Sequence, residues 1–221
     1  VQPEDLPEAS FGVHYMALLE AGGDFYDVLR VSEHIFGYFI ADVSGHDLAT
    51  GYMTSAVKAL LKQNCIPLYQ PIESIHMINE VLTEILPLGK YLTACYARLN
   101  RKTKKMTIIN CGHPPVVYFP KKGESRLIML EGDVLGAFRE VYFGKQEIRV
   151  HKGDRFILYS DGLIEDPGGK KVWTDGLDAL LKVCNQLRGI PIRQLAERVF
   201  ELLGGNRGHV EDDVVVMAIE I

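Results

Sequence analysis

The sequence has 221 residues, of which 47% are hydrophobic and 24% charged, a composition typical of a globular protein and not of a disordered chain. Its net charge of −5 and isoelectric point near 5.8 argue against a nucleic-acid-binding protein, which usually carries a basic stripe. The sequence also lacks an apolar run of membrane-spanning length and a signal-peptide pattern at its start.

Residues 1–10 contain two prolines and three acids with little periodicity, and they predict a linker from an upstream region that the sequence lacks. The first residue, Val1, is not a methionine, which favours the same interpretation. Residues 11–221 are expected to form one domain, because neither an internal repeat nor a long glycine-rich linker divides them.

Apolar runs predict strands, and apolar residues at helical spacing predict helices. In chain order we expect strands at 13–19, 27–31 and 35–43, helices at 49–61 and 72–86, strands at 92–99, 106–110, 116–119, 126–130, 145–150 and 155–159, helices at 177–186 and 192–202, and a strand at 214–221. The strands at 92–99, 106–110 and 116–119 are expected to form an antiparallel meander. This order predicts the α+β class rather than alternating βαβ units.

The four cysteines have no CxxC spacing, which argues against a zinc site and against disulfide pairing. They lie in or near apolar runs, which predicts buried, reduced thiols. A reducing, cytoplasmic location follows as the expectation. The cysteines are Cys65, Cys95, Cys111 and Cys184.

Four turns, at 22–27, 41–46, 159–162 and 211–214, each place an aspartate at the edge of an apolar run, near glycine or another acid. A strand end holds a carboxylate rigidly and a glycine lets the backbone turn sharply, as a metal site requires. Carboxylates and carbonyls without a matching Cys or His cluster favour Mg²⁺ or Mn²⁺ over zinc. Each turn alone also has a structural explanation, so the prediction depends on all four.

Five collinear segments of residues 11–221 resemble the motifs of the SpoIIE/RsbU-like branch of the bacterial metal-dependent (PPM, type 2C-like) serine/threonine phosphatases. The segments read GGDFYD at 22–27, DVSGH at 42–46, NCGHPP at 110–115, GDRFILYSDG at 153–162 and EDD at 211–213. The resemblance implies a four-layer α-β-β-α sandwich of two antiparallel sheets flanked by helix pairs. It also implies a site for two Mn²⁺ or Mg²⁺ ions at one end of the sheets, where an activated water would attack the phosphorus.

Carried over by motif position, the resemblance implies five metal ligands: Asp24, Asp42, the backbone carbonyl of Val43, Asp161 and Asp212. Among them Asp42 is expected to bridge the two ions. Asp27 and Asp213 are expected to orient or tune the ligands. His46 either donates a proton to the leaving serine oxygen or is an ordered turn histidine. His113 is expected to end a strand and cap a turn.

Two residues depart from the family pattern: Asp47 stands where glycine is usual, and Val215 stands where threonine is usual. Neither change removes a predicted ligand. Both keep open the alternative of a catalytically weak or inactive domain that acts as a protein-binding regulatory module. A nucleotide cyclase, suggested by Gly22–Phe25, is excluded because the expected Glu-Phe pair is absent and the later aspartate motifs have no place in that fold.

Within this family the usual substrate is a phosphorylated anti-sigma-factor antagonist of a partner-switching pathway. The resemblance therefore implies a phosphoprotein partner and an upstream sensor or receiver domain that regulates the phosphatase. An upstream helical segment is a candidate for forming a homodimer, and neither a nucleic acid nor a membrane is expected as a partner. The choice between manganese and magnesium is left open by oxygen ligands.

Overall fold

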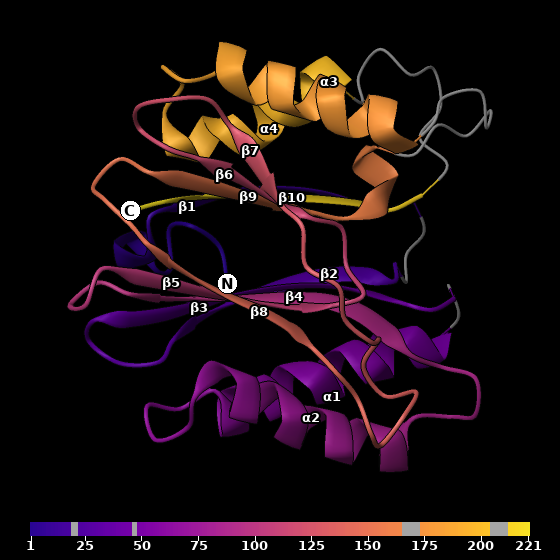
Figure 1. Ribbon diagram of the computed structural model, residues 1–221. Helices are drawn as coiled ribbons and strands as arrows, with labels where there is room; N and C mark the ends of the chain where they lie inside the picture. The colour runs from indigo at the N-terminus through magenta and orange to yellow at the C-terminus, as the bar shows by residue number, and fades with distance from the viewer. Residues whose placement is uncertain (19–21, 46–47, 165–172, 204–211) are drawn as a thin grey trace. The chain divides into compact units, whose positions relative to one another are not determined.

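The computed structural model of the protein describes residues 1–18, 22–45, 48–164, 173–203 and 212–221 (Figure 1). The chain divides into two compact units. Unit 1 consists of Val1–Leu18, Pro114–Met129 and His151–Ile221, and unit 2 consists of Leu19–His113 and Leu130–Val150. Each unit contains one five-stranded antiparallel sheet and one pair of long helices.

The sheet of unit 2 has the strand order β2-β3-β4-β5-β8, and every neighbouring pair is antiparallel. Its strands are β2 (Asp24–Arg30), β3 (Ile35–Val43), β4 (Leu92–Asn100), β5 (Lys105–Cys111) and β8 (Gly144–Arg149), and its helices are α1 (Leu48–Asn64) and α2 (Pro71–Ile85). Alternate residues of β3, including Phe39 and Ala41, pack with Val57 of α1 and Ile78 of α2. Alternation along a strand directs the residues between them to the other face of the sheet.

Helix α2 begins and ends where its sequence provides the signals. Pro71 occupies the first turn, and the backbone N–H of Gln70 donates to Glu73 Oε2 at 2.7 Å within a capping box. At the other end, Pro87 follows Leu86, whose extended backbone leaves the helix. The buried residues between, such as Ile75 and Leu82, lie one or two turns apart on the face that meets the sheet.

The sheet of unit 1 has the strand order β1-β10-β9-β6-β7. Its strands are β1 (Phe11–Met16), β10 (Val214–Glu220), β9 (Arg155–Tyr159), β6 (Val116–Phe119) and β7 (Arg126–Ile128), and its helices are α3 (Trp173–Gln186) and α4 (Ile192–Leu203). Val214, Val216 and Ala218 of β10 share a core with Leu180 of α3 and Leu195 of α4. Two short 3-10 helices, Pro7–Ala9 and Asp161–Leu163, complete this unit.

The structure confirms the α+β class, with two antiparallel sheets and four long helices in the described ranges. Strands β3, β6 and β9 have the predicted bounds. The predicted meander is wrong, because β6 pairs with β9 and β7 in the other sheet, while β5 pairs with β4 and β8. The chain leaves β5 through a turn at Gly112, whose φ of 69° suits glycine, and the following Pro114 and Pro115 have no N–H to extend the ladder.

The four cysteines are buried and free, as predicted. Burial raises the pKa of the Cys65 thiol to about 11. Among the residues that the structure covers, no helix is both long and apolar enough to cross a membrane. The linker at residues 1–10 and the single domain over 11–221 stay predictions, although Ala9 is fully buried and Arg193 of α4 donates to Glu4 at 2.7 Å.

Candidate metal centre

The first two aspartate motifs meet at one end of the unit 2 sheet. Asp24 begins β2, Asp42 is the penultimate residue of β3, and the two are directly opposite each other in the antiparallel register. On the other side of β3, Asp42 is opposite Thr93 of β4. Residues directly opposite on neighbouring strands have Cβ atoms about 5 Å apart on one face of the sheet. Asp24, Asp42 and Thr93 thus form a row on the face away from α1 and α2.

Oxygen atoms of the predicted ligands converge beside Gly23. A Cβ atom built on Gly23 would lie 2.8 Å from Asp42 Oδ1, 2.8 Å from the carbonyl oxygen of Val43 and 3.6 Å from that of Gly45. The turn is fixed by the N–H of Val43, which donates to the carbonyl of Gly23 at 3.1 Å. Carboxylate and carbonyl oxygens around a space that only glycine leaves open are the donor set that Mg²⁺ and Mn²⁺ prefer. These residues therefore fit a hard divalent cation.

Ser44, which follows the predicted ligand Val43, is held by the chain that enters β4. Its N–H donates to the carbonyl of Tyr91 at 3.0 Å, and its Oγ accepts from the N–H of Tyr91 at 3.0 Å. Lys90 Nζ donates to the carbonyl of Ser44 at 2.9 Å. These three hydrogen bonds fix the backbone of the motif DVSG after Asp42. Sequence analysis missed Lys90 and Tyr91, which carry no motif of their own.

His113 contacts Thr93, the third residue of the row that contains the two aspartates. His113 Nδ1 lies 3.0 Å from Thr93 Oγ1, and the backbone N–H of His113 donates to Asn110 Oδ1 at 2.9 Å. Asn110 Nδ2 in turn donates to the carbonyl of His113 at 2.8 Å. His113 follows the end of β5, as predicted, but the side chain of Asn110 closes the turn, and the ring of His113 contacts Thr93, the cross-strand neighbour of Asp42.

The other two aspartates meet within unit 1. Asp161 opens the 3-10 helix after β9, and Asp212 precedes β10, the antiparallel neighbour of β9. A Cβ on Gly162 would lie 2.3 Å from the carbonyl oxygen of Asp213 and 3.4 Å from Asp212 Cβ, so the two turns touch. Burial raises the pKa of the Asp161 carboxyl, and the neighbouring Asp212 carboxylate raises it further. A bound cation would relieve this repulsion.

Within the described ranges, no group of three or more His, Cys, Asp and Glu side chains is arranged to hold a metal ion. Unit 2 contains the pair Asp24 and Asp42 with the carbonyl of Val43, and unit 1 contains the pair Asp161 and Asp212. His46 and Asp47 lie outside the described residues, so the two interpretations of His46 and the effect of Asp47 stay predictions.

The supporting aspartates differ from each other. Asp213 Oδ1 accepts from the N–H of Leu18 at 2.7 Å, which ties the start of β10 to the chain after β1. Asp27 is buried three residues after Asp24, so strand alternation places it on the helix-covered face, opposite to that of Asp24. Its Oδ1 accepts from the N–H of Val28 at 3.0 Å. Asp213 therefore supports a strand end, whereas Asp27 lies away from the row of predicted ligands.

Val215, where the family pattern has threonine, is fully buried in β10. Its N–H donates to Ser160 Oγ at 2.9 Å, and its carbonyl accepts from the N–H of Ser160 at 3.0 Å. Ser160 directly precedes Asp161, so this pair of hydrogen bonds fixes the backbone that carries the predicted ligand. The serine hydroxyl anchors the two strand ends without any hydroxyl on residue 215.

The family model described as Stage II sporulation protein E (SpoIIE) matches residues 32–221, most of the chain. The chain belongs to the SpoIIE family. This SpoIIE-family domain is 24% identical over 156 residues to the phosphoserine phosphatase RsbP of Bacillus subtilis (strain 168). The match covers 69% of the chain and 39% of RsbP, so the chain spans well under half of that relative.

Two solved structures share the fold of the SpoIIE-family domain. The SiaA-PP2C domain of Pseudomonas aeruginosa has a TM-score of 0.83 and 16% identity, with 100% of this chain and 90% of that one covered. RsbX in complex with magnesium has a TM-score of 0.71 and 15% identity, with 95% and 94% covered. The family and the fold are those that the sequence motifs predicted.

Proposed function

We propose that this domain is a metal-dependent protein serine/threonine phosphatase that dephosphorylates a regulatory phosphoprotein. The convergence of Asp42 Oδ1 and the carbonyl oxygen of Val43 beside Gly23 carries the proposal. Carboxylate and carbonyl oxygens are the ligands that Mg²⁺ and Mn²⁺ prefer. The similarity to a phosphoserine phosphatase supports the reaction class.

The proposed ligands of two divalent cations are Asp24, Asp42 and the Val43 carbonyl in unit 2 and Asp161 and Asp212 in unit 1, with Asp42 as the bridging carboxylate. Such cations, when bound, lower the pKa of a water molecule and offset the charge on phosphoryl oxygens. RsbX was crystallised with magnesium, which supports Mg²⁺, and oxygen ligands accept Mn²⁺ equally well.

The chain's own residues position the ligands. The hydrogen bonds from Lys90 and Tyr91 hold Ser44, so the preceding carbonyl of Val43 keeps its direction. Lys90 also brings a positive charge to this turn, which favours the approach of a phosphate dianion. His46 is proposed as the group that gives a proton to the leaving serine oxygen.

The proposed substrate is a phosphorylated anti-sigma-factor antagonist of a partner-switching pathway, acting in the cytoplasm. An upstream sensor or receiver domain, and a homodimer formed through an upstream helix, are part of the same proposal. The similarity to RsbP supports this assignment, and the chain corresponds to only part of that relative.

The test is manganese-dependent hydrolysis of para-nitrophenyl phosphate by the wild type and by Asp42→Asn. We expect Asp42→Asn to lose activity by at least about 100-fold, since a ligand to the reacting centre is removed. Asp178→Asn, at an exposed position of α3, is the matched control and should keep wild-type activity. Equal rates for the wild type and Asp42→Asn would contradict a catalytic role and favour the binding-module alternative.

A further inference from the structure

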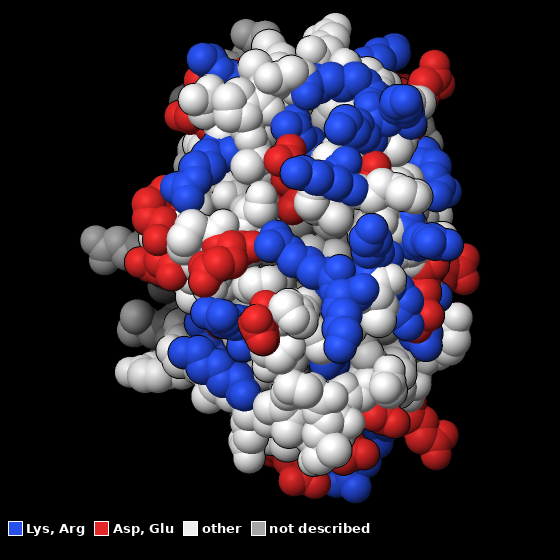
Figure 2. All heavy atoms as spheres, turned by 90° about the vertical axis from the view of Figure 1, so that its left-hand side faces the viewer, with Lys and Arg blue, Asp and Glu red and all other residues white. Residues whose placement is uncertain are grey.

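A basic pocket lies in unit 1, at the opposite end of the sheet from Asp161 and Asp212. It has a volume of about 350 Å³ and is lined by Lys121, Lys152, Arg155, Arg188 and Glu220, with Phe119, Pro120, Gly153 and Ile221. The charged side chains of its lining carry a formal charge of +3, although the whole chain carries −5. Figure 2 shows the side of the molecule on which β10 ends, where lysine and arginine side chains gather.

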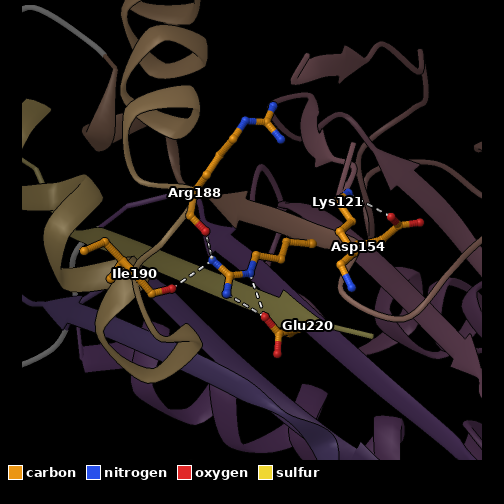
Figure 3. A network of polar contacts seen from close by, with 6 residues as sticks. Lys121, Asp154, Arg188, Ile190 and Glu220 are labelled. Carbon is orange, nitrogen blue, oxygen red and sulfur yellow. Dashed lines mark hydrogen bonds and ion pairs between the residues drawn. The ribbon is translucent and has the colours of Figure 1, made fainter. Parts of the chain in front are cut away.

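The one side-chain carboxylate of the pocket lining, that of Glu220, is paired with Arg155. Arg155 donates from Nε to Glu220 Oε2 at 2.7 Å, and its Nη2 lies 2.6 Å from the same oxygen. Its Nη1 donates to the carbonyls of Arg188 and Ile190 at 3.2 and 2.9 Å (Figure 3). Arg155 and Glu220 therefore neutralise each other and tie the loop before α4 to the ends of β9 and β10. No second side chain of the lining carries a negative charge.

Arg188 is fixed without a counter-charge. Its Nη1 donates to the carbonyl of Pro120 at 2.9 Å, its Nη2 donates to Asn185 Oδ1 at 2.6 Å, and its guanidinium carbon lies 4.6 Å from the centre of the Phe119 ring. In Figure 3 its side chain points away from its own carbonyl oxygen, which faces the Arg155 network. The charge of an arginine that is held by neutral groups is not compensated, and its remaining N–H donors can bind an anion.

The two lysines of the pocket also keep their charges available. Asp154, two residues after Lys152, accepts instead from the backbone N–H of Lys121 at 3.0 Å, the backbone N–H of His151 at 2.9 Å and Tyr118 Oη at 2.9 Å. In the part of the chain that the structure describes, neither Lys121 Nζ nor Lys152 Nζ forms an ion pair with a carboxylate. Among the described residues, Lys121, Lys152 and Arg188 thus line one pocket without a side-chain carboxylate as an ion-pair partner.

We propose that this pocket is a second, non-catalytic anion site that binds the phosphate group of a small molecule. A phosphate monoester carries a charge of about −1.5 to −2, which matches a site of this charge better than a single carboxylate does. Arginine beside two lysines is a common arrangement for holding several phosphate oxygens. The volume lies within the range of roughly 300–1,000 Å³ that small-molecule sites occupy. The proposal is independent of the proposed phosphatase activity.

The test is a titration of the ¹⁵N-labelled protein with inorganic phosphate, followed by NMR. EDTA removes divalent cations, so that phosphate does not bind at the predicted metal centre, and sodium chloride keeps the ionic strength constant. We expect saturable shifts of the amides of Lys121, Gly153 and Arg188. The double variant Lys121→Gln/Lys152→Gln should bind phosphate about tenfold more weakly, because two charged contacts are lost.

The matched control is Lys122→Gln, which removes an exposed charge next to Lys121 but outside the pocket lining. This variant should bind phosphate as the wild type does. The proposal is overturned if the pocket amides show no saturable shifts, or if Lys122→Gln weakens binding as much as the double variant. Both substituted lysines are exposed, so the variants are expected to fold, and wild-type spectra of the core residues check this.

Discussion

Asp24 and Asp42 are directly opposite each other on β2 and β3, on the sheet face away from α1 and α2. Two carboxylates in cross-strand contact repel each other, and this arrangement destabilises a sheet unless a cation compensates it. The adjacent Gly23 leaves space for one, because Asp42 Oδ1 and the Val43 carbonyl face the position that a side chain would occupy. The register of one strand pair therefore places two aspartates that are 18 residues apart in the sequence next to each other.

Gly23→Ala should weaken manganese binding while the domain stays folded. The added methyl would lie 2.8 Å from Asp42 Oδ1 and from the Val43 carbonyl oxygen, so both oxygens must move. Isothermal titration with Mn²⁺ should show affinity reduced by at least about tenfold. Gly51→Ala is the control, since a Cβ there meets nothing within 4 Å; it should keep its affinity and raise the unfolding free energy by about 0.5–1 kcal/mol. Equal affinities in the two variants would rule out a cation beside Gly23.

Lys90→Met should lower kcat by about tenfold, because the turn that carries the Val43 carbonyl loses the hydrogen bond from Nζ to Ser44. Methionine keeps most of the apolar stem, so the unfolding free energy should change little. Steady-state hydrolysis of para-nitrophenyl phosphate with Mn²⁺ measures the effect. Lys102→Met, at an exposed position between β4 and β5, is the control. A Lys90→Met enzyme with wild-type kcat would remove this lysine from the positioning of the turn.

Element types and most boundaries followed from local sequence, as at β3, β6 and β9, where apolar runs end at turn residues. The pairing of the strands could not be predicted from local sequence. The sequence predicted that β6 continues the meander of β4 and β5, yet β6 belongs to the other sheet. An antiparallel connection of a few residues looks the same in sequence whether the next strand pairs locally or not. The chain turns away from β5 at Gly112, which has a positive φ, and two hydrogen bonds between the side chain of Asn110 and the backbone of His113 hold this turn.

The candidate ligands were accessible from sequence because each aspartate belongs to a motif, and the motifs occur in a fixed order. The residues that hold those motifs in place could not be predicted from the sequence. Lys90 and Thr93 each act through one side-chain hydrogen bond, with a backbone carbonyl and with a ring nitrogen, and such contacts leave no spacing pattern. Asp27 shows the reverse case, since it matches a motif position but lies on the opposite face of its strand from Asp24.

Asp154→Asn should destabilise the protein by about 2 kcal/mol, because an amide cannot accept all the hydrogen bonds that reach this buried carboxylate. Burial opposes ionisation of Asp154, but the hydrogen bonds from Lys121, His151 and Tyr118 outweigh it and lower the pKa. A lowered pKa contributes stability above the ordinary value of 3.8, and this contribution is lost as the pH falls through the folded-state pKa. Urea unfolding should therefore show a difference between wild type and variant that is constant from about pH 5 to 8 and shrinks below about pH 4. A constant difference down to the most acidic pH would contradict this account.

Asp161→Asn should stabilise the metal-free protein at pH 7 and weaken its response to metal. Burial and the Asp212 carboxylate raise the pKa of Asp161, so its contribution to stability is fully present below the ordinary value of 3.8 and is lost as the pH rises through the folded-state pKa. Urea unfolding in EDTA should show the variant more stable than the wild type at pH 7, with the difference vanishing toward pH 4.

Added Mn²⁺ should reverse that order at pH 7. A bound cation stabilises the ionised pair Asp161 and Asp212 in the wild type, whereas the variant offers a neutral amide and gains less from mass action. The midpoint of urea unfolding should therefore rise more for the wild type than for Asp161→Asn as Mn²⁺ is added. Asp178→Asn should follow the wild type in both conditions. Equal gains in Asp161→Asn and the wild type would show that Asp161 is not a ligand, even if the pH dependence in EDTA is as expected.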